Sequence, residues 1–161
     1  MAAGPQATLV FQGTVPSVIP GGDHTITGPG GAPLPQGTLL VTPTGQVTTV
    51  NPVTFEVHAL TGSTMGAEAK TQYKVTLVSS TLIAGTATID NSKNVVTLNG
   101  TALTPGTPSS AIEQSQSSVT FANEQGFNVA DVGAGGVVEA KVIIMIEPPT
   151  ASPDGSTSRS R

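Results

Sequence analysis

The chain has no cysteine and no tryptophan, and its aromatic residues are four phenylalanines and one tyrosine. Without cysteine there is no disulfide framework, no thiolate zinc site and no cysteine nucleophile. The scarcity of aromatic side chains leaves Val, Ile, Leu and Ala to build the core, and it argues against a sugar-binding cleft. No segment approaches the roughly 20 apolar residues of a membrane span, because the longest apolar run covers only residues 142–146. We therefore expect no membrane partner.

Charge is also scarce. Charged residues make up 10% of the sequence, against roughly 25% in an ordinary soluble domain. We expect the surface to be covered by Thr, Ser, Asn and Gln, or by neighbouring subunits, and both are common in proteins that function within an assembly. Both arginines, Arg159 and Arg161, lie at the C-terminal end, and the rest of the chain carries four lysines against ten acidic residues. A negative body repels phosphate, so we expect no nucleic-acid partner.

The first residues, MAAGPQATLVFQ, lack the basic start and the long apolar run of a secretory leader. We therefore expect synthesis in a cytoplasm, without export by the usual route. The sequon Asn99-Gly100-Thr101 would be glycosylated only in a secretory compartment, so we expect it to remain unmodified.

Proline and glycine divide the chain into an extended beginning and a proline-poor body. Residues 1–37 hold six prolines and eight glycines, whereas no proline occurs at 53–104 or at 109–147. Proline removes a donor from the β-ladder and is therefore kept out of central strands. The pattern predicts an extended N-terminal arm over residues 1–37, a β-sandwich domain over 38–148 and a short C-terminal tail over 149–161.

Within the proline-free windows, apolar and polar residues alternate with a period of two, which is typical of strands with one buried face. The segments 53–60, 71–80 and 137–147 show this alternation most clearly. Residues 86–98 read as a hairpin that turns at 90–94, and Ser110–Glu113 fits a capping box that could begin a short helix. We predict an all-β fold, either a β-sandwich or a jelly-roll-like domain.

The stretch PGGDHTITGPGGAPLPQG, residues 20–37, raises the question of a ligand-binding glycine loop. A phosphate loop leads into a helix, but the prolines after Gly31 exclude one. Asp23 and His24 are adjacent and would point to opposite faces of a strand. Glu56 and His58 alternate on the polar face of a strand, where two ligands are too few for a dedicated metal site. The residues therefore predict no catalytic site, no metal site and no cofactor.

The arm either lies across a neighbouring subunit or folds onto its own sandwich, and the sequence favours neither strongly. Alone in water, such a segment would lose much conformational entropy for little burial. The last strand carries apolar residues on both faces near its end, which indicates burial on both sides or an interface. The candidate interface residues are Leu9, Val10, Phe11, Val15, Val18, Ile19, Ile26, Ile143 and Met145.

The N-terminal run MAAGPQATLVFQGTVPSVIPGG, together with the low charge and the absence of cysteine, resembles the head decoration (cement) proteins of tailed bacteriophages. The resemblance covers general character and carries no diagnostic motif. It implies a non-enzymatic structural protein of a virion, made in the host cytoplasm and assembled as an oligomer, often a trimer. Such a protein would stabilise the shell by bridging neighbouring subunits of the major capsid protein.

Other function classes fit the same pattern. Segments such as LLVTPTG and YKVTLVSS are also similar to pilin-like or adhesin surface modules, which require export. A tail or fibre component of a virion would share the composition of a head protein. A sandwich hydrolase is the remaining alternative, and it would have to use His24 or His58.

Overall fold

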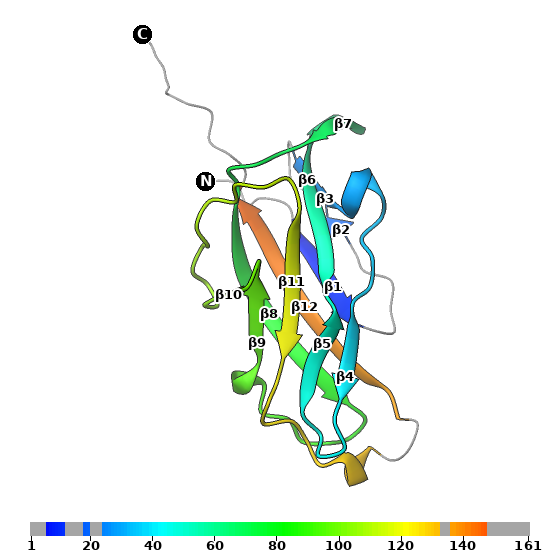
Figure 1. The fold of residues 1–161 in the computed structure, drawn as a ribbon. Helices are drawn as coiled ribbons and strands as arrows, with labels where there is room; N and C mark the ends of the chain where they lie inside the picture. The colour runs from blue at the N-terminus through cyan, green and yellow to red at the C-terminus, as the bar shows by residue number, and fades with distance from the viewer. Residues whose placement is uncertain (1–5, 12–17, 20–23, 133–135, 148–161) are drawn as a thin grey trace.

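The computed structural model describes residues 6–11, 18–19, 24–132 and 136–147. Two layers of antiparallel β-sheet face each other, and the helical segments in the described part of the chain are single 3₁₀ turns (Figure 1). The apolar core lies between the layers. The predicted all-β fold is therefore confirmed. The 3₁₀ turns are η1 (Pro29–Gly31), η2 (Asn91–Lys93) and η3 (Val129–Asp131).

The first sheet has the strand order β2-β1-β12-β8. Its strands are β2 (Val18–Ile19), β1 (Gln6–Phe11), β12 (Val138–Glu147) and β8 (Lys74–Ala84). Each neighbouring pair is antiparallel, and a β-bulge interrupts the register between β12 and β8 at Ile143/Ile144. The strands nearest the two ends of the chain, β1 and β12, thus lie side by side in the middle of this sheet.

The second sheet has the order β10-β9-β11-β6-β3, with β7 also paired to β6. Its strands are β10 (Thr101–Ala102), β9 (Val95–Leu98), β11 (Ser117–Ala122), β6 (Val53–Thr61), β3 (His24–Thr27) and β7 (Thr64–Ala69). The hairpin of β4 (Thr38–Val41) and β5 (Val47–Asn51) extends this layer.

Pro52 separates β5 from β6, because proline has no N–H to donate to a ladder. The side chain of Thr49 links β5 to β11 through two hydrogen bonds. The Phe121 N–H donates to Thr49 Oγ1 at 2.7 Å, and Thr49 Oγ1 donates to the Phe121 carbonyl at 2.7 Å. β11 therefore runs beside both β5 and β6 as if they were one strand.

The core is aliphatic, as the composition predicted. The alternation along β12 is observed directly: every second side chain from Val138 to Ile146 is buried, and those between are half-buried or exposed. Phe55 and Tyr73 lie at the centre, with their ring centroids 6.3 Å apart. The fully covered aliphatic side chains of the core include Ile26, Val47, Val53, Val57, Val75, Val142, Ile144 and Ile146.

The predicted boundary at residue 37 does not separate an arm from the sandwich. β1 pairs with β12 in the first sheet, and β3 pairs with β6 in the second. Ile26 on β3 is only 1% exposed, so its prediction as an interface residue is wrong. Deleting residues 1–20 would remove the strand that pairs with β12, and we therefore expect such a truncation to destabilise the sandwich.

Two local expectations are also corrected. The predicted hairpin over 86–98 does not form, because β8 ends at Ala84 and pairs with β12, while β9 begins at Val95 in the other sheet. The chain crosses between the sheets where the hairpin was expected. The capping-box segment Ser110–Glu113 forms no helix, since its backbone bonds to residues next to β8 instead.

Candidate functional site

The predicted interface residues Ile143 and Met145 lie on the outward face of β12, where both are half-buried. In the ladder with β8, Ile143 is opposite Ser79 and Met145 is opposite Thr76. Two further aliphatic residues on β8, Val78 and Ile83, are 46% and 45% exposed. We call the surface formed by Val78, Ile83, Ile143 and Met145 the docking face.

Charged residues stand at both ends of the docking face. Glu139 is opposite Ile83, and its carboxylate lies 3.9 Å from the ammonium of Lys141. At the other end, Glu147 is the register partner of Lys74. Val78, Ile143 and Met145 therefore form an aliphatic middle with both signs of charge on either side, and Ile83 lies beside Glu139 at one charged end.

The remaining predicted interface residues belong to the start of the chain. Leu9, Val10 and Phe11 lie on β1, opposite Val142, Lys141 and Ala140 of β12. On the other side of β1, Val18 and Ile19 of β2 pair with Ala7 and Gln6. Val15 lies outside the described residues. The backbones of β1 and β2 are thus paired within their own chain.

Glu56 and His58 come together in a way that the strand pattern did not predict. Both project from β6 and are 5% and 2% exposed. His58 Nε2 lies 2.8 Å from Glu56 Oε1, and His58 Nδ1 lies 2.8 Å from the Gly66 carbonyl. The second carboxylate oxygen of Glu56 accepts a hydrogen bond of 2.8 Å from the Gln116 side chain.

The glycine stretch that raised the question of a ligand loop covers this pair. A backbone hydrogen bond from Gly30 reaches the Glu56 carboxylate, so the turn after β3 binds a carboxylate of its own chain. Hydrogen bonds from Gln116 and Gly30 lower the pKa of Glu56 below its usual value, with His58 contributing in the same direction. Because the ring nitrogens of His58 are both directed at acceptors within the fold, we interpret the cluster as a structural clasp.

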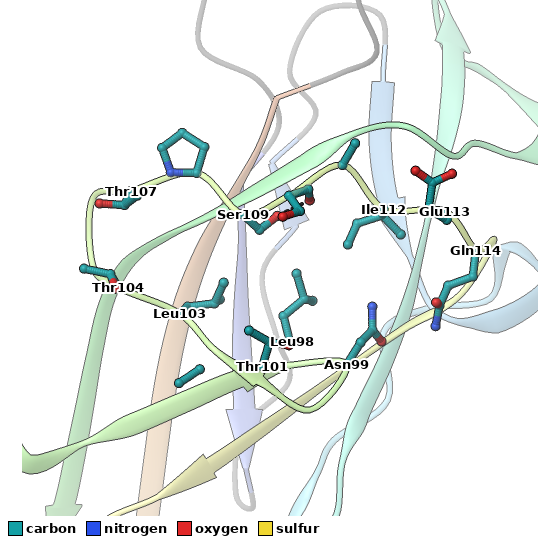
Figure 2. A pocket seen from close by; sticks show the side chains of 14 residues that line it. Leu98, Asn99, Thr101, Leu103, Thr104, Thr107, Ser109, Ile112, Glu113 and Gln114 are labelled. Carbon is teal, nitrogen blue, oxygen red and sulfur yellow. Dashed lines mark hydrogen bonds between the residues drawn. The ribbon is translucent and has the colours of Figure 1, made fainter.

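A cavity of about 310 Å³ opens at the end of the sandwich where β9 ends and β11 begins. The chain from Leu98 to Gln114 forms almost a closed ring around it, and Leu98, Leu103 and Ile112 converge on its middle (Figure 2). Leu98 and Ile112 are buried, whereas most other lining residues are exposed. The cavity thus has an aliphatic base and a polar rim.

The far wall of the cavity is attached to the edge of β8 and to the residues just before it. The Gly106 N–H donates to the Leu77 carbonyl at 3.0 Å, and the Ser109 N–H donates to the Val75 carbonyl at 2.8 Å. The Val75 N–H in turn donates to Ser109 Oγ at 3.0 Å. These bonds satisfy backbone groups of an edge strand and hold the wall in place.

Sequence reasoning did not identify the cavity. Its residues are neither apolar-periodic nor rich in titratable groups, and the signals available were turn residues, such as Asn99-Gly100 and Pro108. The cavity exists because the segment that follows β10 wraps around the end of the sandwich. Such a long-range path leaves no local pattern.

The described residues contain no group of three or more His, Cys, Asp or Glu side chains that could hold a metal ion. Within the same residues, no helix has the length and apolar character needed to cross a membrane. Comparisons with protein-family models, with curated proteins and with solved structures gave no match.

Proposed function

We propose that this protein is a non-enzymatic structural component of a virus particle, a decoration protein that binds the assembled shell through the docking face. The observation that carries the proposal is the aliphatic middle of this face with Glu139, Lys141, Lys74 and Glu147 at its ends. Protein interfaces characteristically have a core poor in charge and a polar rim. A sheet face of this kind can dock without leaving a buried charge unpaired.

The rest of the surface supports the same function. Charged residues form only 10% of the chain, so docking removes few ions from water. Other exposed aliphatic side chains, such as Leu40 and Val50 at 51% and 55% exposure, lie on the β4–β5 hairpin. A protein with apolar residues on two separate surfaces is suited to bridging two neighbours in a lattice.

A protein of this kind stabilises a shell by mass action. It binds the assembled lattice and not the free subunits, so the lattice gains free energy that grows with the concentration of the bound protein. Bridging two shell subunits adds an effective-concentration advantage, because the second contact forms within the same complex. Neither effect requires a reaction or a cofactor.

The test uses particles from the organism that encodes the chain. An antibody against the protein should label the heads of purified particles, and the protein should cosediment with them. In reconstitution with stripped particles, Val78→Lys should weaken binding by about tenfold or more, because it places an unpaired charge in the aliphatic middle of the docking face. The matched control is Val95→Lys, which changes an equally exposed aliphatic residue on β9, outside both surfaces. Label on cell surfaces or tails, with none on heads, would contradict the proposal.

A further inference from the structure

We propose that the cavity at the Leu98–Gln114 end binds a polypeptide segment in which an aliphatic side chain is followed by a basic residue. The aliphatic side chain would enter the base between Leu98 and Ile112, and the basic group would pair with Glu113 at the rim. This site is separate from the docking face, and the inference does not depend on the proposed function.

The base of the cavity determines the first half of the ligand. Leu98 and Ile112 are 4% and 7% exposed, and Leu103 faces them from the opposite wall (Figure 2). A volume of about 310 Å³ is at the lower end of the roughly 300–1,000 Å³ range of ligand pockets. It suits one aliphatic side chain with its backbone better than a large organic cofactor.

The rim of the cavity determines the second feature of the ligand, its basic residue. Among the described residues that line the cavity, Glu113 is the only charged one. Its Oε1 accepts a hydrogen bond of 2.5 Å from the Gln72 side chain, and no described residue donates to its Oε2. A carboxylate with an open oxygen next to an apolar cavity is complementary to an ammonium or guanidinium group.

Backbone strain at Gln72, next to the rim residue Glu113, gives independent support for a binding site here. Gln72, which bonds to Glu113 at the rim, has a φ of +66°, and the other non-glycine residue with positive φ in the described chain is Asn99, at +52°, in the Asn99-Gly100 turn between β9 and β10. Asn is common in this conformation, but Gln is not. Strained residues persist where the surrounding structure holds them, and they are concentrated at functional sites. Here the Gln72 N–H is held by the Ile112 carbonyl at 2.6 Å.

The polar side chains of the rim match a peptide backbone. The hydroxyls of Thr101, Thr104 and Thr107 and the amide of Gln114 border the cavity, and none of them bonds to another described residue. Hydroxyl and amide groups can donate to a carbonyl and accept from an N–H. An extended segment crossing the rim would therefore find partners for its main chain, in addition to the anchor and the ion pair.

The experiment uses the full-length ¹⁵N-labelled protein and three capped peptides. The first, acetyl-Gly-Leu-Arg-Gly-amide, has both features; the second replaces Arg by Gln, and the third replaces Leu by Ser. We expect the first peptide to shift the amide signals of Asn99, Thr101 and Glu113 with a millimolar dissociation constant. Loss of the leucine should weaken binding about tenfold, and loss of the arginine about threefold.

Two variants separate the ion pair from general effects of charge. In Glu113→Gln, the Arg and Gln peptides should bind equally well, whereas Glu124→Gln, an exposed carboxylate outside the cavity, should keep the threefold preference. Ala102→Tyr, which fills the cavity from β10, should abolish binding while the other amide signals stay in place. The proposal is overturned if the first peptide shifts no cavity signal at 10 mM peptide, if the Ser peptide binds as well as the Leu peptide, or if Glu113→Gln leaves the preference for arginine unchanged.

Discussion

The two ends of β11 show opposite ways of closing a sandwich. Beyond its C-terminal end, the backbone of Gly126 packs against Gly45, which lies between β4 and β5. The contact is so close that a Cβ on Gly126 would overlap the Gly45 carbonyl. At its N-terminal end, beyond Ser117, the segment 98–114 encircles a cavity of about 310 Å³. We call the first the locked end and the second the cavity end. One end excludes even a methyl group, and the other leaves room for a side chain.

The locked end is closed by main-chain contacts and buried amide groups. Asn123 is 1% exposed, and its Oδ1 accepts from the Gly126 N–H at 2.8 Å. Its amide nitrogen donates to the Asp90 carbonyl at 3.2 Å and to Asn94 Oδ1 at 2.7 Å. At the cavity end, Ser117 Oγ accepts from Asn99 Nδ2 at 3.3 Å and lies 3.0 Å from the Tyr73 hydroxyl, and no hydrogen bond joins described residues across the cavity itself. The polar groups at this end therefore lie beside the cavity and leave its middle open for binding.

The largest effect should come from adding one methyl group at the locked end. Gly126 has a φ of +69°, and a Cβ there would overlap the Gly45 carbonyl and come within 3.0 Å of Gln46 Cα. We expect Gly126→Ala to lower the free energy of unfolding by more than about 3 kcal/mol, measured by urea denaturation.

The control lies at the cavity end. Gly100 has an even larger positive φ of +88°, but a Cβ there would meet nothing within 4 Å. Gly100→Ala should therefore cost only the conformational penalty of about 1 kcal/mol. Equal losses for the two variants would show that the overlap at Gly126 is relieved by movement, and the locked end would then be no more rigid than the cavity end.

Asn123→Ala should have the next largest effect. It removes the partner of the buried Gly126 N–H and the bonds to Asn94 Oδ1 and the Asp90 carbonyl, which are part-buried, and an unsatisfied buried group costs about 1–3 kcal/mol. We expect a total loss of about 3 kcal/mol by urea denaturation. Asn51→Ala, which removes a single exposed bond of 3.3 Å to Thr38, should cost less than about 0.5 kcal/mol. A similar loss for both would mean that the network adds nothing beyond one surface bond.

The strands that could be predicted are those whose two faces differ. β12 alternates along its whole length, and its buried positions are the apolar ones that the period of two identified. The predicted hairpin over 86–98 failed because turn residues do not reveal which sheet a following strand joins. Likewise, the proline and glycine content of residues 1–37 predicted short extended pieces, but it could not show that β1 lies next to β12.

The burial of Glu56 and His58 could not be predicted for the same reason. On β6 they alternate like a solvated face, and the groups that cover them come from Gly30, Gly66 and Gln116. Only the outward positions of Ile143 and Met145 followed from the local pattern. The cavity depends on where the segment after β10 crosses the end of the sheet, which is a tertiary property.

Acid should distinguish the Glu56 clasp from the locked end. The folded protein lowers the pKa of Glu56 from its ordinary value of 4.5, so the ionised carboxylate contributes stability above that pH. This stability is lost as the pH falls through the lowered pKa. We expect the urea midpoint of the native protein to fall below pH 4.5, and Glu56→Gln to be less stable at pH 7 with a weaker fall. An equally steep fall in Glu56→Gln would assign the acid sensitivity to other groups.

The smallest effect should come from the cavity end itself. Glu113 is exposed, and its bond to Gln72 links two exposed side chains, so solvent and a substituted amide can replace it. We expect Glu113→Gln to change the free energy of unfolding by less than about 0.5 kcal/mol, measured in the same urea series as Gly126→Ala. A loss above about 1.5 kcal/mol would mean that Gln72 and Glu113 hold the fold together. The strain at Gln72 would then have a structural purpose, and the separation between a stabilising end and a binding end would fail.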